Sequence, residues 1–291
     1  MLVRVGCTFT YATSWPTPTV MLVAARPDAM HCVVEEDRLV TPDTPVHDAI
    51  DGLGNRYWRL TIPEGTLQVT YDALIEVPKE PDPVLINAPQ TPVDALPDDA
   101  LIFTLPSRHC QSDILSDAAW ALFGGTMPGW RRVQAICDWV HQHIRYQKGS
   151  TASTSAVDVY EARAGVCRDF AHMGVVFCRA MNIPARYVFG YLPDVGIVPP
   201  DEPMDFHAWF EAYVDGQWRT FDARHNMPRI GRIPIGRGRD AVDVAMATTY
   251  GAARLERMEV WSDEVDVEGT VLSGLNAGTT VRARRLMEAI R

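Results

Sequence analysis

The hydrophobic pattern of the chain changes from a period of two to a helical period shortly after residue 100. In the first hundred residues, apolar and polar side chains alternate over 4–11, 60–62 and 67–77, which is typical of half-buried strands. Residues 63–66, Pro-Glu-Gly-Thr, separate the last two runs and predict a hairpin connection. We therefore predict a small antiparallel sheet domain here, followed by a linker rich in Pro and Asp over 78–97.

Helical periodicity dominates from about residue 110 to residue 181. Apolar side chains recur at intervals of three and four over 112–122, 130–144 and 167–181, and a shorter helix is expected at 157–163. The glycine pair 124–125 should end the first of these helices. The sequence Asn182-Ile-Pro184 should end the last one, because proline disfavours helical geometry in the residue before it.

Three strand-like runs follow, at 185–192, 207–214 and 217–223. The dipeptide Asp215-Gly216 lies between the last two runs and is a strong signal for a two-residue hairpin. Beyond residue 229 the pattern is mixed. Residues 258–261 are a candidate strand, and residues 281–290 are either a terminal helix or a frayed tail.

Composition restricts the class of protein. A chain of 291 residues can bury the core of one large domain or of two modest ones, and 47% hydrophobic with 22% charged residues is ordinary for a soluble globular protein. The net charge of −10, with no basic cluster, argues against a nucleic-acid partner. The first residues lack the pattern of a signal peptide, and the apolar run 20–25 is too short to span a membrane. We expect a cytoplasmic protein without a membrane partner.

Six cysteines, at 7, 32, 110, 137, 167 and 178, have no short paired spacing. A structural zinc site is therefore disfavoured, and we expect the cysteines to be reduced. Cys167 differs from the others because it follows Gly165, read as a turn, and begins an apolar-patterned helix. The positive end of the helix dipole favours the thiolate at such a position. The remaining cysteines are predicted to be core residues, above all Cys178 within an apolar stripe.

The Asp215-Gly216 turn makes a geometric prediction about a histidine and an aspartate. If these two residues form the turn, Val214 faces Gln217 and Trp209 faces Asp222. His207, Trp209 and Asp222 then share one face, because side chains alternate along a strand. His207 and Asp222 become diagonal neighbours with Cα atoms about 7–8 Å apart, which suits a histidine–carboxylate hydrogen bond. A one-residue slip of register would place them on opposite faces.

Cysteine, histidine and aspartate in this order suggest a nucleophile, its base and the group that orients the base. If the helix that begins at Cys167 packs against this sheet, its N-terminus lies near the face that carries His207. The backbone N–H of Cys167 is then the natural donor to a developing oxyanion. Taken singly, each residue also has a structural reading, as a core thiol, a strand histidine or a strand-edge charge.

Other polar residues close to these positions have simpler interpretations. We expect His172 to be structural and Arg168 and Asp169 to anchor the start of the helix. His225 is the main rival for the base, although it follows the strand and lacks an obvious orienting carboxylate. Trp209 is expected to be a wall of the site or a core residue.

Four segments carry a resemblance to a known family: 164–172 (AGVCRDFAH), 182–187 (NIPARY), 206–211 (FHAWFE) and 220–225 (TFDARH). They resemble the catalytic blocks of the transglutaminase-like superfamily, and more narrowly its bacterial branch of cysteine-protease-like proteins. The resemblance includes 107–113 and 135–141 and runs from about residue 100 to 230, more loosely to 262. The first hundred residues are similar, less specifically, to the β-rich region that such proteins often carry.

This resemblance implies an α+β fold with a papain-like core of helices packed on an antiparallel sheet. It implies a β-rich N-terminal domain at 1–98, a catalytic domain at 99–262 and a C-terminal extension at 263–291. Cys167 would attack an amide carbonyl and form a thioester, His207 would carry protons and Asp222 would orient His207. Animal transglutaminases carry calcium sites, but no acidic calcium loop is found in this sequence, so we expect neither a metal nor another cofactor.

The acceptor of the acyl group separates the possible functions. Water as acceptor makes the protein a cysteine peptidase or amidase acting on a peptide or protein substrate, which is our leading hypothesis. A primary amine as acceptor makes it a crosslinking transglutaminase. A third possibility is a non-catalytic binding module that keeps the fold. The sequence leaves the substrate and the oligomeric state open.

Overall fold

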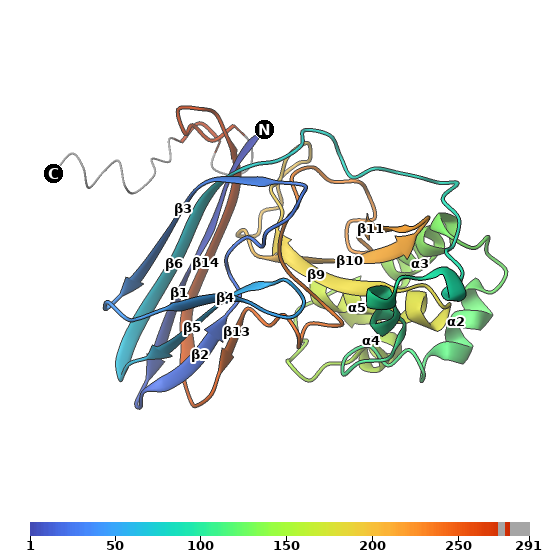
Figure 1. Cartoon of the computed structure of the whole chain (residues 1–291), viewed down its shortest axis with the longest axis horizontal. Coiled ribbons are helices and arrows are strands. Elements are labelled where there is room, and N and C mark those ends of the chain that lie inside the picture. Colours follow the sequence, from blue (N-terminus) through green and yellow to red (C-terminus); the bar gives the residue numbers. More distant parts are fainter. Residues whose placement is uncertain (273–276, 280–291) are drawn as a thin grey trace.

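The structure is a computed structural model that describes residues 1–272 and 277–279. It has a β-rich part and a part in which helices pack on a sheet, lying side by side in Figure 1. The possible terminal helix at 281–290, and with it most of the expected extension at 263–291, lies outside the described residues. Among the described residues, no helix combines the length and the apolar character needed to cross a membrane.

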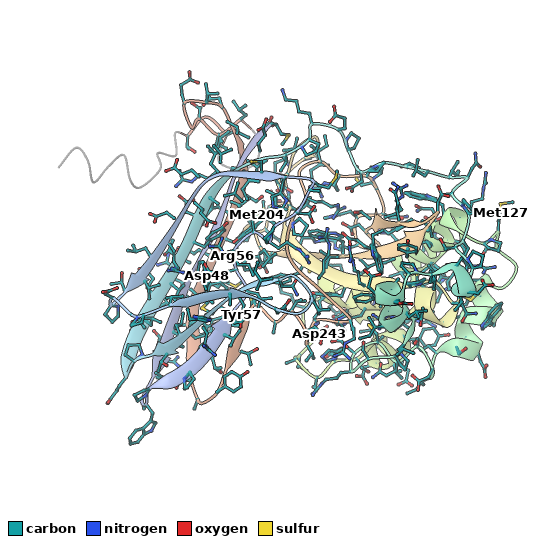
Figure 2. The ribbon with its side chains drawn as sticks, viewed as in Figure 1. Asp48, Arg56, Tyr57, Met127, Met204 and Asp243 are labelled. Carbon is teal, nitrogen blue, oxygen red and sulfur yellow. The ribbon has the colours of Figure 1, made fainter. Side chains whose placement is uncertain are left out.

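The β-rich part contains two four-stranded antiparallel sheets instead of the single small sheet expected. The first has the order β14-β1-β6-β3, with β14 (Arg254–Val265), β1 (Leu2–Thr13), β6 (Gly65–Glu76) and β3 (Cys32–Thr41). The second has the order β13-β2-β5-β4, with β13 (Ala247–Thr249), β2 (Thr17–Met21), β5 (Arg56–Ile62) and β4 (His47–Ile50). Arg56 of β5 joins the two sheets by ion pairs to Asp48 of β4 and to Glu36 of β3, both at 2.7 Å (Figure 2).

The expected hairpin at 63–66 is wrong. β5 pairs with β2 and β4, whereas β6 pairs with β1 and β3, so the connection passes from one sheet to the other. Alternation along the chain reveals that a strand exists, but its partner depends on which faces are buried together.

The end of the described chain returns to the β-rich part. β14 pairs with β1 from Leu2–Val265 to Ala12–Arg254, and β13 pairs with β2. The candidate strand at 258–261 is therefore real, but it belongs to the N-terminal sheet. The boundary drawn at residue 262 falls within β14.

The second part of the molecule is built on one antiparallel sheet and agrees closely with the predicted elements. Its strand order is β11-β10-β9-β12, with β9 (Ala185–Tyr191), β10 (His207–Val214), β11 (Gln217–Phe221) and β12 (Ile233–Gly238). The helices are α2 (Ser116–Phe123), α3 (Trp130–His143), α4 (Ala156–Ala162) and α5 (Cys167–Ala180), preceded by the short turns η1 (Val93–Ala95), α1 (Asp98–Leu101) and η2 (Ile102–Thr104). This arrangement confirms the α+β class.

Helix α5 lies directly against the sheet. A Cβ added at Gly174 would lie only 2.3 Å from Cε1 of Phe210 on β10, so this close approach requires glycine. The sequence pattern predicts a turn at Gly165, and this prediction is wrong. Instead, residues 164–165 form the two-residue strand β8 (Ala164–Gly165), which pairs in parallel with β7 (Arg145–Tyr146). Gly165 is needed for a different reason, because a Cβ there would lie 2.7 Å from that of Asp169.

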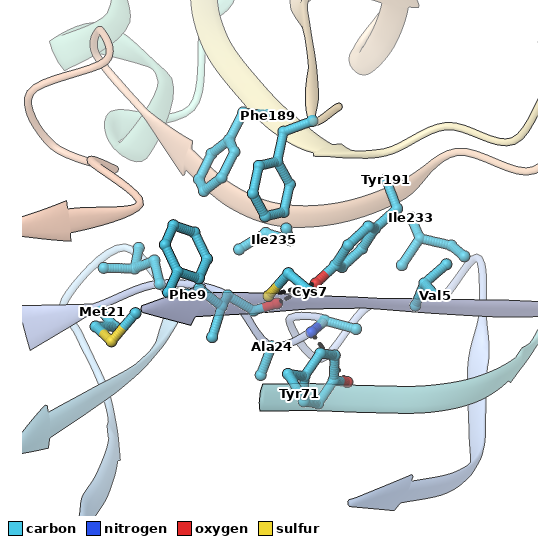
Figure 3. Close-up of a cluster of buried hydrophobic side chains, with 14 of the residues drawn as sticks. Val5, Cys7, Phe9, Met21, Ala24, Tyr71, Phe189, Tyr191, Ile233 and Ile235 are labelled. Carbon is cyan, nitrogen blue, oxygen red and sulfur yellow. Dashed lines mark hydrogen bonds between the residues drawn. The ribbon is translucent and has the colours of Figure 1, made fainter. Parts of the chain in front are cut away.

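One hydrophobic core connects the two parts of the molecule. Val5, Cys7 and Phe9 of β1 face Phe189 and Tyr191 of β9 in Figure 3. The hydroxyl of Tyr191 donates to the carbonyl of Val23 at 2.8 Å. A second core lies between the helices and β10. The β-rich part is thus packed firmly against the sheet that carries the candidate site.

Candidate active site

Cys167 is the first residue of α5, as the sequence predicts. The N-terminus of this helix is fixed by Asp169, whose Oδ2 accepts the backbone N–H of Val166 at 2.8 Å. Arg168 donates to Oδ1 of the same carboxylate from Nε at 3.1 Å, and the hydroxyl of Ser150 also contacts it. Asp169 is fully buried. The prediction that Arg168 and Asp169 anchor the helix start is therefore confirmed.

The residue Cys167 is partly buried and lines a cleft of about 140 Å³. Burial raises the pKa of this thiol to about 11, although backbone hydrogen bonds from Ala208 and Arg168 act in the opposite direction. The expected thiolate is wrong for this structure, because desolvation outweighs the helix N-terminus. Contact with the backbone of Ala208 places the thiol beside the chain neighbour of His207.

The other five cysteines differ from Cys167 in their surroundings. Cys32 is exposed, and none of the six forms a disulfide, as expected for reduced cysteines. The remaining four are buried in the cores, as predicted, at positions 7, 110, 137 and 178. Cys32 is an exception to the predicted core role, because it begins the edge strand β3.

The β10–β11 hairpin has the predicted register, with Val214 opposite Gln217 and Phe210 opposite Phe221. The ladder ends at Phe221, one residue before Asp222. Nε2 of His207 nevertheless lies 2.8 Å from Oδ2 of Asp222, so the expected histidine–carboxylate hydrogen bond is present. This bond leaves Nδ1 of His207 as the ring nitrogen that can serve the thiol.

Asp222 is held by several donors at once. Nη2 of Arg232 donates to Oδ2 at 3.0 Å, and the backbone N–H groups of Arg224 and His225 donate to Oδ1, each at 3.0 Å. Burial alone would raise the pKa of Asp222. His207 and Arg232 outweigh burial and hold this pKa well below its usual range. The carboxylate is therefore ionised and fixed in orientation.

His207 is neutral at pH 7. Burial lowers its pKa to about 4, even though Asp222 acts to raise it. The neutral ring donates from Nε2 to the carboxylate, so Nδ1 carries a lone pair. A neutral imidazole beside a neutral thiol suits a general base that takes the proton as the thiol attacks.

His225 occupies a more prominent position than expected. Its ring stacks on that of His207 with centroids 4.5 Å apart, and its Nδ1 lies 3.2 Å from Oδ2 of Asp222. The inference that His225 lacks a carboxylate is therefore wrong, because β11 ends early and the chain turns back beneath Asp222. Its contact with Arg229, at 3.2 Å from Nη1 to Nδ1, distinguishes it from His207.

His172 and Trp209 take the roles that the sequence suggested. His172 is buried, and its Nε2 accepts the backbone N–H of Ala241 at 3.1 Å, as expected for a structural residue. Trp209 is also buried, with its ring stacked 6.3 Å from that of His207. Trp209 is therefore a core residue beside the histidine, and it does not line the cleft that contains Cys167.

Sequence reasoning missed several residues of the site. Arg232 lies on the Trp209 ring, with its guanidinium carbon 5.0 Å from the ring centroid, and joins the site from ten residues beyond Asp222. Tyr146 and Arg224 stack at 3.9 Å and line the cleft. The loop between β9 and β10 brings Asp205 into the cleft together with Met204, which is labelled in Figure 2. No motif spacing connects these residues to Cys167.

His207, Asp222 and His225 offer three potential metal-ligand atoms that all lie within 4.8 Å of one another. A cation here would compete with Arg232, which already donates to the same carboxylate oxygen. The positive charge of Arg232 opposes a second cation at this position. The donor set therefore fits a hydrogen-bonded network better than a metal site.

The family of the chain follows from comparison with known proteins. Residues 118–223, a range that contains Cys167, His207 and Asp222, match the model of the transglutaminase-like superfamily. An uncharacterised protein of Mycobacterium tuberculosis (strain H37Rv) is 30% identical over 244 residues, which is 76% of this chain and 78% of that protein. The chain belongs to the transglutaminase-like superfamily.

Two further relatives show how far the similarity extends. A crystal structure from Cytophaga hutchinsonii, described as a "putative cysteine protease", is 36% identical, covers 93% of each chain and has a TM-score of 0.83. An uncharacterised protein of Mycobacterium leprae is 34% identical over 119 residues, 40% of this chain and 42% of that protein. The matched segment thus spans less than half of the M. leprae protein. The similarity to the Cytophaga structure extends over nearly the whole chain, so it supports the described fold including the β-rich part.

Proposed function

We propose that this protein is a cysteine peptidase or amidase that cleaves peptide-type amide bonds through a thioester at Cys167. The observation that carries the proposal is the 2.8 Å hydrogen bond between His207 and Asp222 beside a cleft that also contains the Cys167 thiol. Membership of the transglutaminase-like superfamily supports acyl transfer, and the Cytophaga relative supports a protease.

Acylation begins from the neutral pair. The thiol of Cys167 gives its proton to Nδ1 of His207 as Sγ attacks the carbonyl carbon, and the carbonyl oxygen becomes an oxyanion. The N-terminus of α5 supplies the expected oxyanion donor, the backbone N–H of Cys167. The imidazolium then protonates the leaving amine as the C–N bond breaks. A thioester and a neutral imidazole remain.

Deacylation uses the same groups in the reverse order. Water gives a proton to Nδ1 of His207 and attacks the thioester carbonyl, and the imidazolium returns the proton to the sulfur as the C–S bond breaks. The products are a carboxylic acid and the free thiol. Asp222 keeps its charge throughout, because it is fixed by Arg232 and by two backbone N–H groups. Its role is to hold Nε2 of His207 and to stabilise the imidazolium.

A peptide-amide library tests this proposal, with Cys167→Ala as the matched control. We expect release of amine by the wild type only, and an acid-quenched sample should contain a covalent acyl adduct that hydroxylamine removes. Equal turnover by the wild type and the Cys167→Ala variant would contradict the proposal.

The acyl acceptor is tested with a glutaminyl peptide and a fluorescent primary amine. For a hydrolase we expect release of ammonia and no fluorescent product. A fluorescent amide that depends on Cys167 would instead establish the crosslinking alternative. Absence of any adduct or turnover over the whole library would favour the non-catalytic binding module.

A further inference from the structure

The segment that connects β6 to η1, residues 78–92, forms a strap that is fixed at both ends. In Figure 1 it runs from the β-rich part across to the helices. Its far end is bound to the β10–β11 turn. There the backbone N–H of Asp215 donates to the carbonyl of Pro89 at 2.9 Å, and that of Gly216 donates to Oγ1 of Thr91 at 3.1 Å. This end of the strap is therefore fixed to the hairpin that carries part of the candidate site.

Asp82 fixes the other end of the strap to the chain beyond Asp222. Its backbone N–H donates to the carbonyl of Arg229 at 2.9 Å, and its Oδ2 accepts the backbone N–H of Arg229, also at 2.9 Å. The same carboxylate oxygen accepts a hydrogen bond from Nε of Arg232 at 2.8 Å. One residue thus makes three hydrogen bonds to the segment that follows Asp222.

Arg232 connects Asp82 with the candidate site. Its Nε is bound to Asp82, and its Nη2 donates to Oδ2 of Asp222 at 3.0 Å. The same Oδ2 lies 2.8 Å from Nε2 of His207. Because two carboxylates hold different nitrogens of one planar guanidinium group, the position of this group is defined at two points. A displacement at Asp82 is therefore transmitted to the acceptor of the His207 hydrogen bond.

The charge of Arg232 is balanced by Asp82 as well as by Asp222. The side chain of Arg232 is 7% exposed and that of Asp222 is 2% exposed, so both charges are desolvated. Asp222 is shared, because His207 and His225 contact the oxygen to which Arg232 donates. Burial would lower the pKa of Arg232, but Asp222 and Asp82 outweigh burial and raise this pKa. Asp82 thus compensates part of a buried charge that is needed beside Asp222.

We infer that Asp82 is a positioning residue of the proposed reaction, which acts through Arg232 to hold Asp222 against His207. The inference rests on the proposed function, because it assigns a part in that reaction to a residue that does not line the thiol cleft. Asp82 also lies outside residues 118–223, so the match to the family model does not include it. The strap thereby joins a segment next to the β-rich part to the orientation of the proposed base.

Asp82→Asn tests the inference, because asparagine keeps the size of the side chain and removes its charge. We expect kcat for the peptide amide to fall about ten- to a hundredfold, with KM changed less than about twofold, since misplacement of a reacting group affects the transition state more than substrate binding. Circular dichroism shows whether the variant is folded. If it is not, Asp82→Ala replaces it with the same expectation, because the smaller side chain leaves room for water beside Arg232. Unchanged kcat in a folded variant would overturn the inference.

Asp72→Asn is the matched control for the loss of a partly buried ion pair. Oδ1 of Asp72 accepts a hydrogen bond from Nε of Arg4 at 2.8 Å, and its side chain is 16% exposed, compared with 18% for Asp82. This pair lies between β1 and β6, in the β-rich part. We expect Asp72→Asn to lower the free energy of unfolding by a similar amount and to leave kcat unchanged. An equal fall in kcat in both variants would reduce Asp82 to a structural residue and overturn the inference.

Proton NMR of the protein without substrate provides a measurement that needs no turnover. The Nε2–H of His207 that donates to Asp222 should give a downfield signal, which is assigned by its loss in His207→Gln. We expect this signal to move upfield in Asp82→Asn and to stay in place in Asp72→Asn. An unchanged signal in folded Asp82→Asn would overturn the inference. A signal that moves as expected, in a protein whose wild type shows no turnover, would contradict the peptidase proposal alone.

Discussion

Two of the cavities near the His207–Asp222 pair differ in size and in chemistry. The thiol cleft, of about 140 Å³, contains Cys167 and His207, both neutral at pH 7 because burial raises one pKa and lowers the other. The larger cavity, of about 510 Å³, contains buried arginines and two tryptophans. His207 has few hydrogen-bond partners, while Asp222 belongs to a densely bonded charged network. In the proposed mechanism, the thiol cleft is the reactive side and the charged network fixes the orientation of Asp222.

Removal of the proposed nucleophile should have the largest effect on activity. Cys167→Ala is expected to lower turnover by at least about 10⁴-fold, because no other thiol lies in the cleft. Release of amine from the peptide amide measures this effect, with circular dichroism as the control for folding. Turnover equal to that of the wild type would contradict a nucleophilic role of Cys167.

Asp222→Asn tests the residue that connects the two sides. An amide cannot stabilise the imidazolium, so we expect a fall in kcat of about 10³–10⁴-fold. Arg232 would keep Asp82 as an ionic partner but would lose the other one, and partial loss of a buried pair should lower the free energy of unfolding by about 3 kcal/mol. Steady-state kinetics and urea unfolding measure these effects. Unchanged kcat in a folded variant would remove Asp222 from the mechanism.

The pH dependence of activity tests whether the reactive side is neutral at rest. The pKa of His207 is lowered to about 4, so its base form is present above that pH and activity should fall only as the pH drops through about 4. An ordinary histidine would produce this loss near pH 6.5. The pH at which kcat/KM falls to half of its plateau value measures this pKa in the free enzyme. Circular dichroism at each pH is the control for folding. A fall in activity centred near pH 6.5 would contradict a buried, neutral imidazole at His207.

Part of this site could be predicted from the sequence, because it depends on residues that are neighbours along the chain. Asp215 and Gly216 both have positive φ, at 53° and 70°, as a two-residue hairpin turn requires, and this turn sets the register that brings His207 to Asp222. The apolar stripe of α5 and the residues at its N-terminus located Cys167 in the same way. These features depend on neighbours in the sequence, so turn chemistry and periodicity predict them well.

Features that depend on distant segments could not be predicted in this way. The 63–66 connection has hairpin-like flanks, but β5 and β6 enter different sheets because their partners lie elsewhere in the chain. The alternation of apolar and polar residues also did not predict that β11 ends at Phe221. The contact of His225 with Asp222, which depends on this early end, was therefore missed. Pairing over long separations is decided by which surfaces bury each other, and a single sequence does not display those surfaces.

The sequence by itself determined the α+β class, the order of helices and strands around the site, and the three residues proposed for chemistry. Only the tertiary structure decided that β14 completes the N-terminal sheet and that Arg232 holds Asp222. It also decided that desolvation outweighs the helix N-terminus at Cys167. The physical reason is the same in each case. The repeat of apolar residues and the chemistry of turns depend on neighbours along the chain, so they can be recognised in the sequence. Burial and electrostatics depend on all the groups that surround a residue in space.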